Sequence, residues 1–140
     1  MDKRGQVSVE YLLVILVLLL VLSIVTIPLI SSSIDASNDV SQASDAKVAT
    51  DTLANAADVV YANGPGAKRT VSFYIPQNTN ITFANGVVKM NLVYSNGTTG
   101  SISSSTQFNF ANNTTAVNSG WHNATVTWPL STKFISVVIG

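Results

Sequence analysis

The sequence predicts an α+β protein: a long N-terminal hydrophobic helix followed by a small antiparallel β-rich head of about six strands. Apolar residues fill positions 11–30 almost without interruption, and they then recur as far as Val60 at spacings that suit one face of a helix. From Arg69 onward apolar and polar residues alternate, which is the period of a half-buried strand. With 140 residues and 46% apolar content, the chain is long enough for one small domain plus a hydrophobic segment.

Residues 11–30 are long enough to cross a membrane. Their only interruptions are Ser23, Thr26 and Pro28, and a helix of this length spans roughly 30 Å, about one hydrocarbon core. A secretory signal peptide would place a small-residue cleavage site after the apolar run, and none is evident after Ile30. We expect Pro28 to kink or locally open the helix, because proline lacks the backbone N–H donor.

A short motif lies between the charged leader and the apolar run. The leader ends at Gly5, and Gln6, Ser8, Glu10 and Tyr11 follow it at fixed spacing. A basic leader, a glycine, Gln-x-Ser-x-Glu-Tyr and an apolar helix in this order resemble the archaeal type IV pilins with a class III signal peptide. The motif covers about seven residues, and about thirty with the helix.

The resemblance implies a type IV pilin-like fold and a processed N-terminus. A prepilin peptidase would cut between Gly5 and Gln6, which makes Gln6 the first residue of the mature chain. The implied partners are further copies of the chain in a helical filament, the prepilin peptidase, the pilus assembly ATPase with its membrane platform, and the membrane before assembly. The precursor would lie in the cytoplasmic membrane and the mature subunit in a filament on the cell surface.

The pattern divides the chain into four expected segments: a cleaved leader at residues 1–5, a membrane or filament-core helix at 6–30, its amphipathic continuation at 31–62, and a β-rich extracellular head at 67–140. A helix continuous from Gln6 to Tyr61 would be roughly 85 Å long, more than a small head needs for its own core. Most of it must therefore find partners elsewhere. Residues 63–66, Asn-Gly-Pro-Gly, are expected to end the helix.

Glu10 is a carboxylate at the edge of an apolar helix, where burial is costly unless the group is paired or protonated. Cleavage would release the α-amino group of Gln6, which is cationic below a pKa of roughly 8. The resemblance implies that the glutamate of one subunit pairs with the amine of a neighbour during assembly. The alternative is an interfacial carboxylate that the helix N-terminus favours.

Turn signals divide the head into strands. Asn85-Gly86 predicts a two-residue hairpin, and residues 95–100 predict another turn. The expected strands lie near residues 71–75, 80–83, 87–94, 107–110, 125–128 and 134–139. The last of these is nearly continuous in apolar residues, so we expect it to be central or covered on both faces.

Five Asn-x-Ser/Thr sequons lie in the head, at Asn80, Asn96, Asn112, Asn113 and Asn123. Such acceptors matter only on an exported surface, and their absence from the helical part fits an outward-facing, glycosylated head. The predicted turn favours Asn96 first, together with Asn123 and one of the overlapping pair Asn112/Asn113.

Catalytic chemistry is sparse. Cysteine is absent, His122 is the only histidine, and no Asp or Glu follows Asp58. We therefore expect no catalytic residues, no cofactor, no metal site and no enzyme activity, with His122 serving as a turn residue. A formal net charge of zero gives no footprint for nucleic acid. The larger aromatic residues of the head are expected to pack in the core rather than form an adhesive surface; they are Trp121, Trp128, Tyr74 and Tyr94.

These features favour a structural pilin of an archaeal type IV pilus-like extracellular filament, serving surface adhesion. Two other functions stay open. The chain can be a membrane-anchored monomeric surface binding protein or a minor pilin, which predicts an intact N-terminus or a low copy number. An archaellum-like motility filament, which uses a similar helix, is the third.

Overall fold

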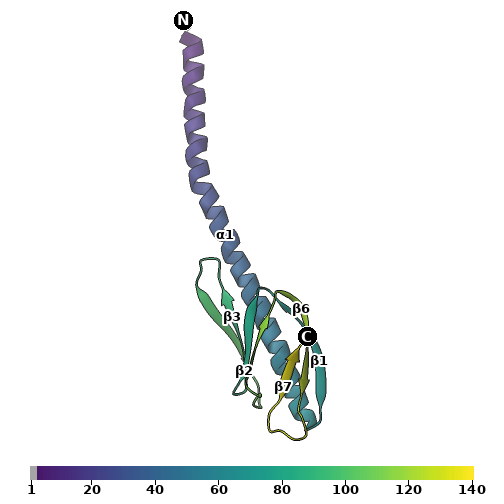
Figure 1. Ribbon diagram of the computed structural model, residues 1–140. Helices are drawn as coiled ribbons and strands as arrows, with labels where there is room; N and C mark the ends of the chain where they lie inside the picture. The colour runs from purple at the N-terminus through teal and green to yellow at the C-terminus, as the bar shows by residue number, and fades with distance from the viewer. Residues whose placement is uncertain (1–2) are drawn as a thin grey trace. The chain divides into compact units, whose positions relative to one another are not determined.

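The computed structural model describes residues 3–140, except for the side chains of Lys3, Arg4 and Gln6. Met1 and Asp2, the start of the expected leader, lie outside the described residues. One helix precedes seven strands (Figure 1), so the predicted α+β class is confirmed, with seven strands rather than about six. The elements are α1 (Lys3–Asn63), β1 (Lys68–Ile75), β2 (Thr79–Ala84), β3 (Val87–Val93), β4 (Thr99–Ser105), β5 (Asn113–Val117), β6 (Gly120–Thr127) and β7 (Ser136–Ile139). The chain forms two compact units, one ending at Asn38 and the other beginning at Asp39, and each is described by itself.

The first unit is the part of α1 that ends at Asn38. Pro28 lies inside the helix and does not end it. Two serine hydroxyls bond back one turn: Ser23 Oγ donates to the carbonyl of Leu19 at 2.8 Å, and Ser33 Oγ to that of Leu29 at 2.9 Å. These bonds satisfy the hydroxyls within the helix itself, so they place no unpaired donor on its apolar surface.

The second unit begins with the rest of α1, whose buried side chains lie on one face. Ala46, Ala49, Leu53, Ala57 and Val60 recur at spacings of three and four residues and are almost fully buried. The helix ends as the sequence predicted. Gly64 has a left-handed φ of 88°, and its N–H donates to the carbonyl of Tyr61 at 3.1 Å.

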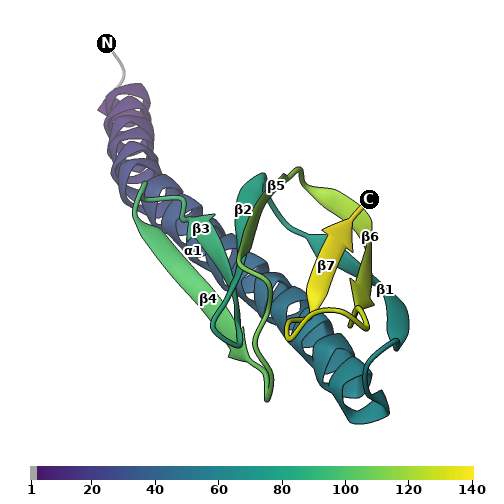
Figure 2. The same cartoon turned by 60° about the horizontal axis from the view of Figure 1, so that its bottom comes forward.

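Two antiparallel sheets complete the second unit. One has the strand order β1-β6-β7 and the other β4-β3-β2-β5 (Figure 2). The predicted hairpin at Asn85-Gly86 is confirmed, because Ala84 pairs with Val87 and both turn residues have positive φ, 50° and 73°. The turn predicted at residues 95–100 joins β3 to β4 over residues 94–98, since Thr99 and Gly100 already belong to β4.

The inner faces of both sheets share one core with the buried face of α1. Two phenylalanines pack against each other in this core: Phe83 and Phe110 meet edge to face, with ring centroids 5.3 Å apart. Strand residues of this core include Phe73, Ile75, Ile81, Val88, Met90, Leu92, Val117, Ala124, Val126 and Val137.

The structure corrects the strand prediction at residues 107–110. This segment is not a strand; only Phe110 makes an isolated parallel bridge, to Ile135. Conversely, β4 and β5 occupy sequences rich in Ser, Thr, Gly and Asn that carry no clear strand signal. Pairing along the whole of β3 holds β4 in place, so tertiary context overrides local preference there.

The last strand was also predicted wrongly. β7 is an edge strand that pairs only with β6 inside its sheet, and Val138 points outward and is largely exposed. Trp121 and Tyr74 are further corrections, because both lie on the surface rather than in the core. Trp128 and Tyr94 do pack against the core, as expected.

Candidate functional site

The motif residues lie on the first turns of α1 and are all exposed where their side chains are described. Ser8, Glu10 and Tyr11 contact no buried core, and the side chain of Gln6 lies outside the described residues. A Cβ added at Gly5 would meet nothing within 4 Å. A glycine inside a helix costs about 1 kcal/mol relative to alanine. Since no neighbouring atom of the chain requires a glycine at position 5, packing within the single chain does not explain this residue.

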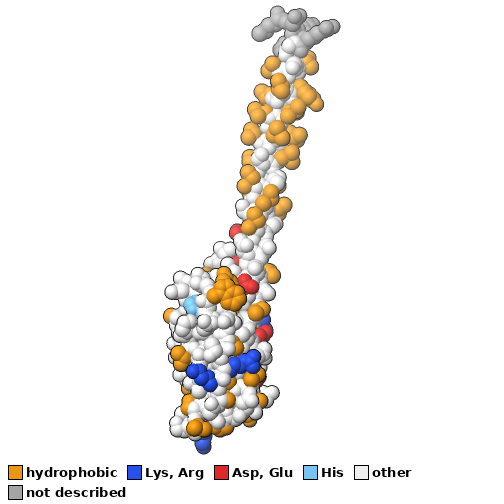
Figure 3. Space-filling view, turned by 90° about the vertical axis from the view of Figure 1, so that its right-hand side faces the viewer, with side chains coloured by type: hydrophobic (Ala, Val, Ile, Leu, Met, Phe, Trp, Pro, Cys, Tyr) orange, Lys and Arg blue, Asp and Glu red, His pale blue; other side chains and the backbone are white. Residues whose placement is uncertain are grey.

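Apolar side chains cover the segment that follows. The helix from Val7 is long and apolar enough to cross a membrane, and none of its most apolar window is buried. Figure 3 shows these hydrophobic side chains on the displayed face of the helix. An apolar surface of this length requires lipid or protein around it.

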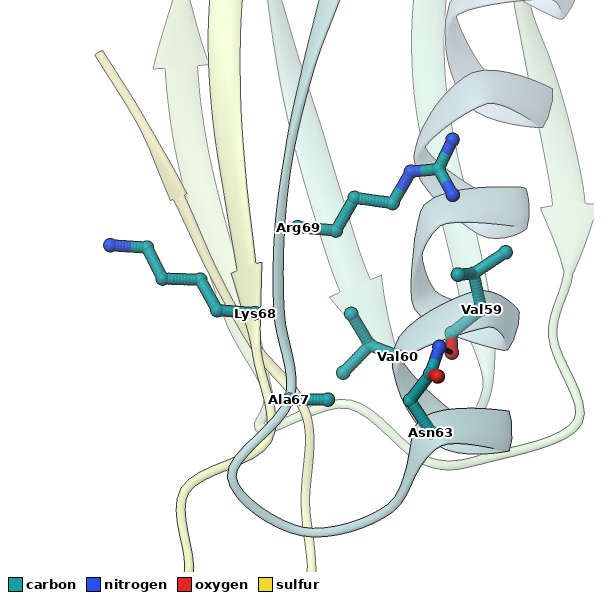
Figure 4. A pocket seen from close by; sticks show the side chains of 6 residues that line it. All are labelled: Val59, Val60, Asn63, Ala67, Lys68 and Arg69. Atoms are coloured by element: carbon teal, nitrogen blue, oxygen red, sulfur yellow. Dashed lines mark hydrogen bonds between the residues drawn. The ribbon is translucent and has the colours of Figure 1, made fainter.

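The largest described groove of the head carries no catalytic set. The largest described groove, about 550 Å³, is lined by Val59, Val60, Asn63, Ala67, Lys68 and Arg69 (Figure 4), with two cations and no acid or nucleophile. Within residues 3–140, no group of three His, Cys, Asp or Glu side chains could hold a metal ion. The expectation that His122 is a turn residue was wrong, because it lies inside β6 and pairs with Phe73 of β1. Its Nε2 bonds to the carbonyl oxygen of Asn118, in the segment between β5 and β6, at 2.9 Å.

Residues 3–29 match the family model described as Class III signal peptide. The chain carries a class III signal peptide. This match, with the long apolar helix and the antiparallel sheets that follow it, confirms the resemblance to type IV pilins. No curated protein and no solved structure shows a significant match to the chain.

The match supports a secreted subunit of the type IV pilin-like or archaellin type, with a secreted or membrane-anchored precursor. It implies processing by a prepilin peptidase and pilus-type assembly in general. Proteins with this signal peptide are structural and are not known as enzymes.

Two carboxylates of α1 fasten loops of the pilin-like head to the helix. Asp39 accepts bonds from the backbone N–H of Ser95 at 2.9 Å and from its hydroxyl at 2.7 Å. Asp58 accepts the backbone N–H of Gln107 at 2.9 Å. Sequence reasoning missed these contacts, since only the fold shows which loops meet the helix.

A third carboxylate, Asp51, belongs to a polar cluster between α1 and β4. Lys47 Nζ donates to Asp51 Oδ1 at 2.8 Å, and the Ser104 hydroxyl lies 2.6 Å from the same oxygen. Lys47 also reaches the backbone oxygen of Ser103 at 3.2 Å. The bond from Lys47, followed by that from Ser104, lowers the pKa of Asp51 below its usual 3.8, against a smaller opposing effect of burial.

This cluster predicts a specific acid dependence of head stability. Because the pKa of Asp51 is lower in the folded chain than in the unfolded one, its ionised form stabilises the head above about pH 4, and this contribution is lost as the pH falls through the folded-state pKa. In thermal unfolding of the detergent-solubilised chain between pH 6 and 2, we expect Asp51→Asn to reduce the loss of Tm on acidification. Lys47→Met should move that loss toward higher pH. If both variants follow the wild-type curve, Asp51 does not contribute to the acid dependence.

The five predicted sequons all lie on exposed residues of the head: Asn80 in β2, Asn96 in the β3–β4 turn, Asn112 before β5, Asn113 at its first position and Asn123 in β6. The side-chain oxygen of Asn96 accepts bonds from the N–H and hydroxyl of Thr98, at 2.9 and 2.6 Å. Asn113 Nδ2 donates to Thr115 Oγ1 at 3.3 Å. Which of them are modified stays a prediction.

Proposed function

We propose that this chain is a structural subunit of a type IV pilus-like extracellular filament, assembled as a helical homo-oligomer through residues 6–30 and serving surface adhesion. The observation that carries the proposal is the exposed apolar length of α1 directly behind a class III signal peptide. Lipid would cover this surface before assembly and the helices of neighbouring copies afterwards. The core of the head supports this, because it uses only the part of α1 that begins near Ala43.

Cleavage between Gly5 and Gln6 would supply a partner for Glu10. Among the side chains that the structure describes, which exclude those of Lys3, Arg4 and Gln6, the ion pair joins Lys47 to Asp51. The α-amino group of a mature Gln6 on a neighbouring copy would neutralise Glu10 inside the apolar bundle. This pairing would set the axial register between subunits. The prepilin peptidase and an assembly ATPase with its membrane platform are the proposed machinery.

The proposal is tested by intact-mass spectrometry on material sheared from the cell surface. Abundant filaments built from a chain that begins at Gln6 would support it. A chain that keeps its leader and occurs only in the membrane fraction would instead identify an anchored surface binding protein. A processed chain at low copy number inside filaments of another subunit would identify a minor pilin. Loss of swimming rather than of surface attachment in a deletion strain would identify an archaellum-like filament.

Replacing Gly5 should block processing without disturbing the fold. A Cβ at this position meets no atom of the chain, so Gly5→Leu leaves the helix intact, while its side chain obstructs the protease at the scissile bond. We expect the variant to stay in the membrane at precursor mass, five residues heavier than the processed chain. Lys3→Arg, which keeps the leader charge, is the control and should be processed normally. Normal processing of Gly5→Leu would show that cleavage does not occur after Gly5.

A further inference from the structure

The outer face of the β1-β6-β7 sheet carries an exposed aromatic pair. Trp121 is 74% exposed and Tyr74 39% exposed; they are directly opposite each other on β6 and β1. Their ring centroids lie 5.7 Å apart at an interplanar angle of 57°. Burying a tryptophan usually stabilises a protein, so an exposed one on a regular strand suggests that another group covers it.

Asn123 lies two residues after Trp121 on β6, and therefore on the same face of the sheet. Thr125 completes its sequon on that face. The hydroxyl of Ser72, opposite on β1, donates to Asn123 Oδ1 at 2.6 Å. This bond fixes the amide by its oxygen, and within the described residues Nδ2 makes no hydrogen bond.

The surroundings of Asn123 leave room beside it. Its neighbour on β1 is the small Ser72, and on the other side the backbone of Gly140 pairs with it, through N–H to O distances of 3.3 and 2.9 Å. Gly140 has no side chain, and a Cβ built there would meet nothing within 4 Å. The amide nitrogen of Asn123 therefore lies on an uncrowded part of the outer face of the sheet, close to Trp121 and Tyr74.

We propose that Asn123 carries an N-linked glycan whose first sugar packs on Trp121, with Tyr74 beside it. The inference rests on the proposed function, since an N-glycan is added only to an exported head. The C–H faces of a pyranose are apolar and match the face of an indole, so their contact removes apolar area of both from water. The hydroxyls of the sugar remain in solvent.

Other sequons have an aromatic residue at the same spacing, but the fold has already covered it. Phe110, two residues before Asn112, is 2% exposed. Tyr94, two residues before Asn96, lies over Gly100, where a Cβ would come within 2.7 Å of its ring. Only Trp121 offers an uncovered ring next to an acceptor asparagine in the described head.

The chemistry needs an activated sugar donor, here a polyprenyl-phosphate-linked oligosaccharide. Nδ2 of Asn123 attacks the anomeric carbon, a C–N bond forms, and the C–O bond to the phosphate breaks. The lipid phosphate leaves with the bonding electron pair, and the proton lost from Nδ2 passes to solvent.

The test uses the full chain, recovered from the surface of the cells that export it, and glycopeptide mass spectrometry of the segment around Asn123. We expect a glycan at Asn123 that is lost in Thr125→Val and kept in Thr125→Ser, a matched pair that leaves the asparagine in place. Hydroxyl-radical oxidation of Trp121, measured in the same peptide, should be higher in Thr125→Val than in Thr125→Ser. Asn96→Gln is the second control and should leave Trp121 oxidation unchanged.

The outcomes separate this inference from the proposed function. An unmodified Asn123 on a processed chain in surface filaments overturns the inference alone. A modified Asn123 with equal Trp121 oxidation in the two Thr125 variants overturns the packing on Trp121. A chain confined to the membrane with its leader intact contradicts the proposed function itself. Protection of Trp121 in assembled filaments of both Thr125 variants, but not in dissociated subunits, would mean that a second copy covers the ring, and would also overturn the inference.

Discussion

Replacing Glu10 with Gln is expected to abolish filaments while cleavage continues. The substitution keeps the size of the side chain and removes its charge, so the α-amino group of a neighbouring Gln6 would be buried without a counter-charge. Burying the unpaired α-amino charge in an apolar bundle costs far more free energy than exposing the neutral amide of the variant side chain on a single, unassembled helix. The variant should therefore accumulate as processed protein in the membrane, with almost none in the sheared surface fraction by immunoblot.

Asp35→Asn is the matched control for this experiment. Asp35 is an exposed carboxylate of the same helix, outside the apolar run, and the same isosteric change there should leave filament amounts near wild type. Intact mass of the membrane fraction separates failed processing from failed assembly. Wild-type filament levels from Glu10→Gln would remove the proposed pairing and leave Glu10 as an interfacial carboxylate.

The sequence was most informative where a feature depends on local chemistry alone. A long apolar run that is surrounded by lipid or by apolar protein must be a helix. Every backbone N–H and C=O must then be paired within the segment, because no water is available to them. The end at Asn63 and the hairpin at Asn85-Gly86 follow from residues that tolerate positive φ. The motif of about seven residues predicted the signal peptide for a different reason, since a linear motif is recognisable without any knowledge of the fold.

Prediction failed where a partner elsewhere in the chain decides the structure. β4 contains Ser101, Ser103 and Ser104, which favour no strand by themselves, but it pairs with β3 along seven residues and meets Lys47 of the helix. The apolar C-terminal strand looked central because composition cannot reveal its place in a sheet. The exposure of Trp121 likewise depends on register, which places its side chain on the outer face.

Replacing Phe110 with alanine should destabilise the head more than any other change proposed above. The sequence predicted it as part of a strand, but its contribution is packing: it is 2% exposed, meets Phe83 edge to face, and bridges to Ile135 beside β7. Removing a buried phenylalanine leaves a cavity between the two sheets and costs about 3–5 kcal/mol.

Denaturant unfolding of the detergent-solubilised chain measures this effect, followed by the combined fluorescence of Trp121 and Trp128. Of these two, Trp128 packs in the head, with its ring centroid 4.8 Å from that of Phe108. Phe134→Ala is the matched control: the same atoms are removed from a side chain that is 48% exposed, so the loss should stay within about 1 kcal/mol. Equal losses in the two variants would show that Phe110 does not join the sheets. A large loss for Phe110→Ala alone would instead show that the buried ring of Phe110 stabilises the core of the head.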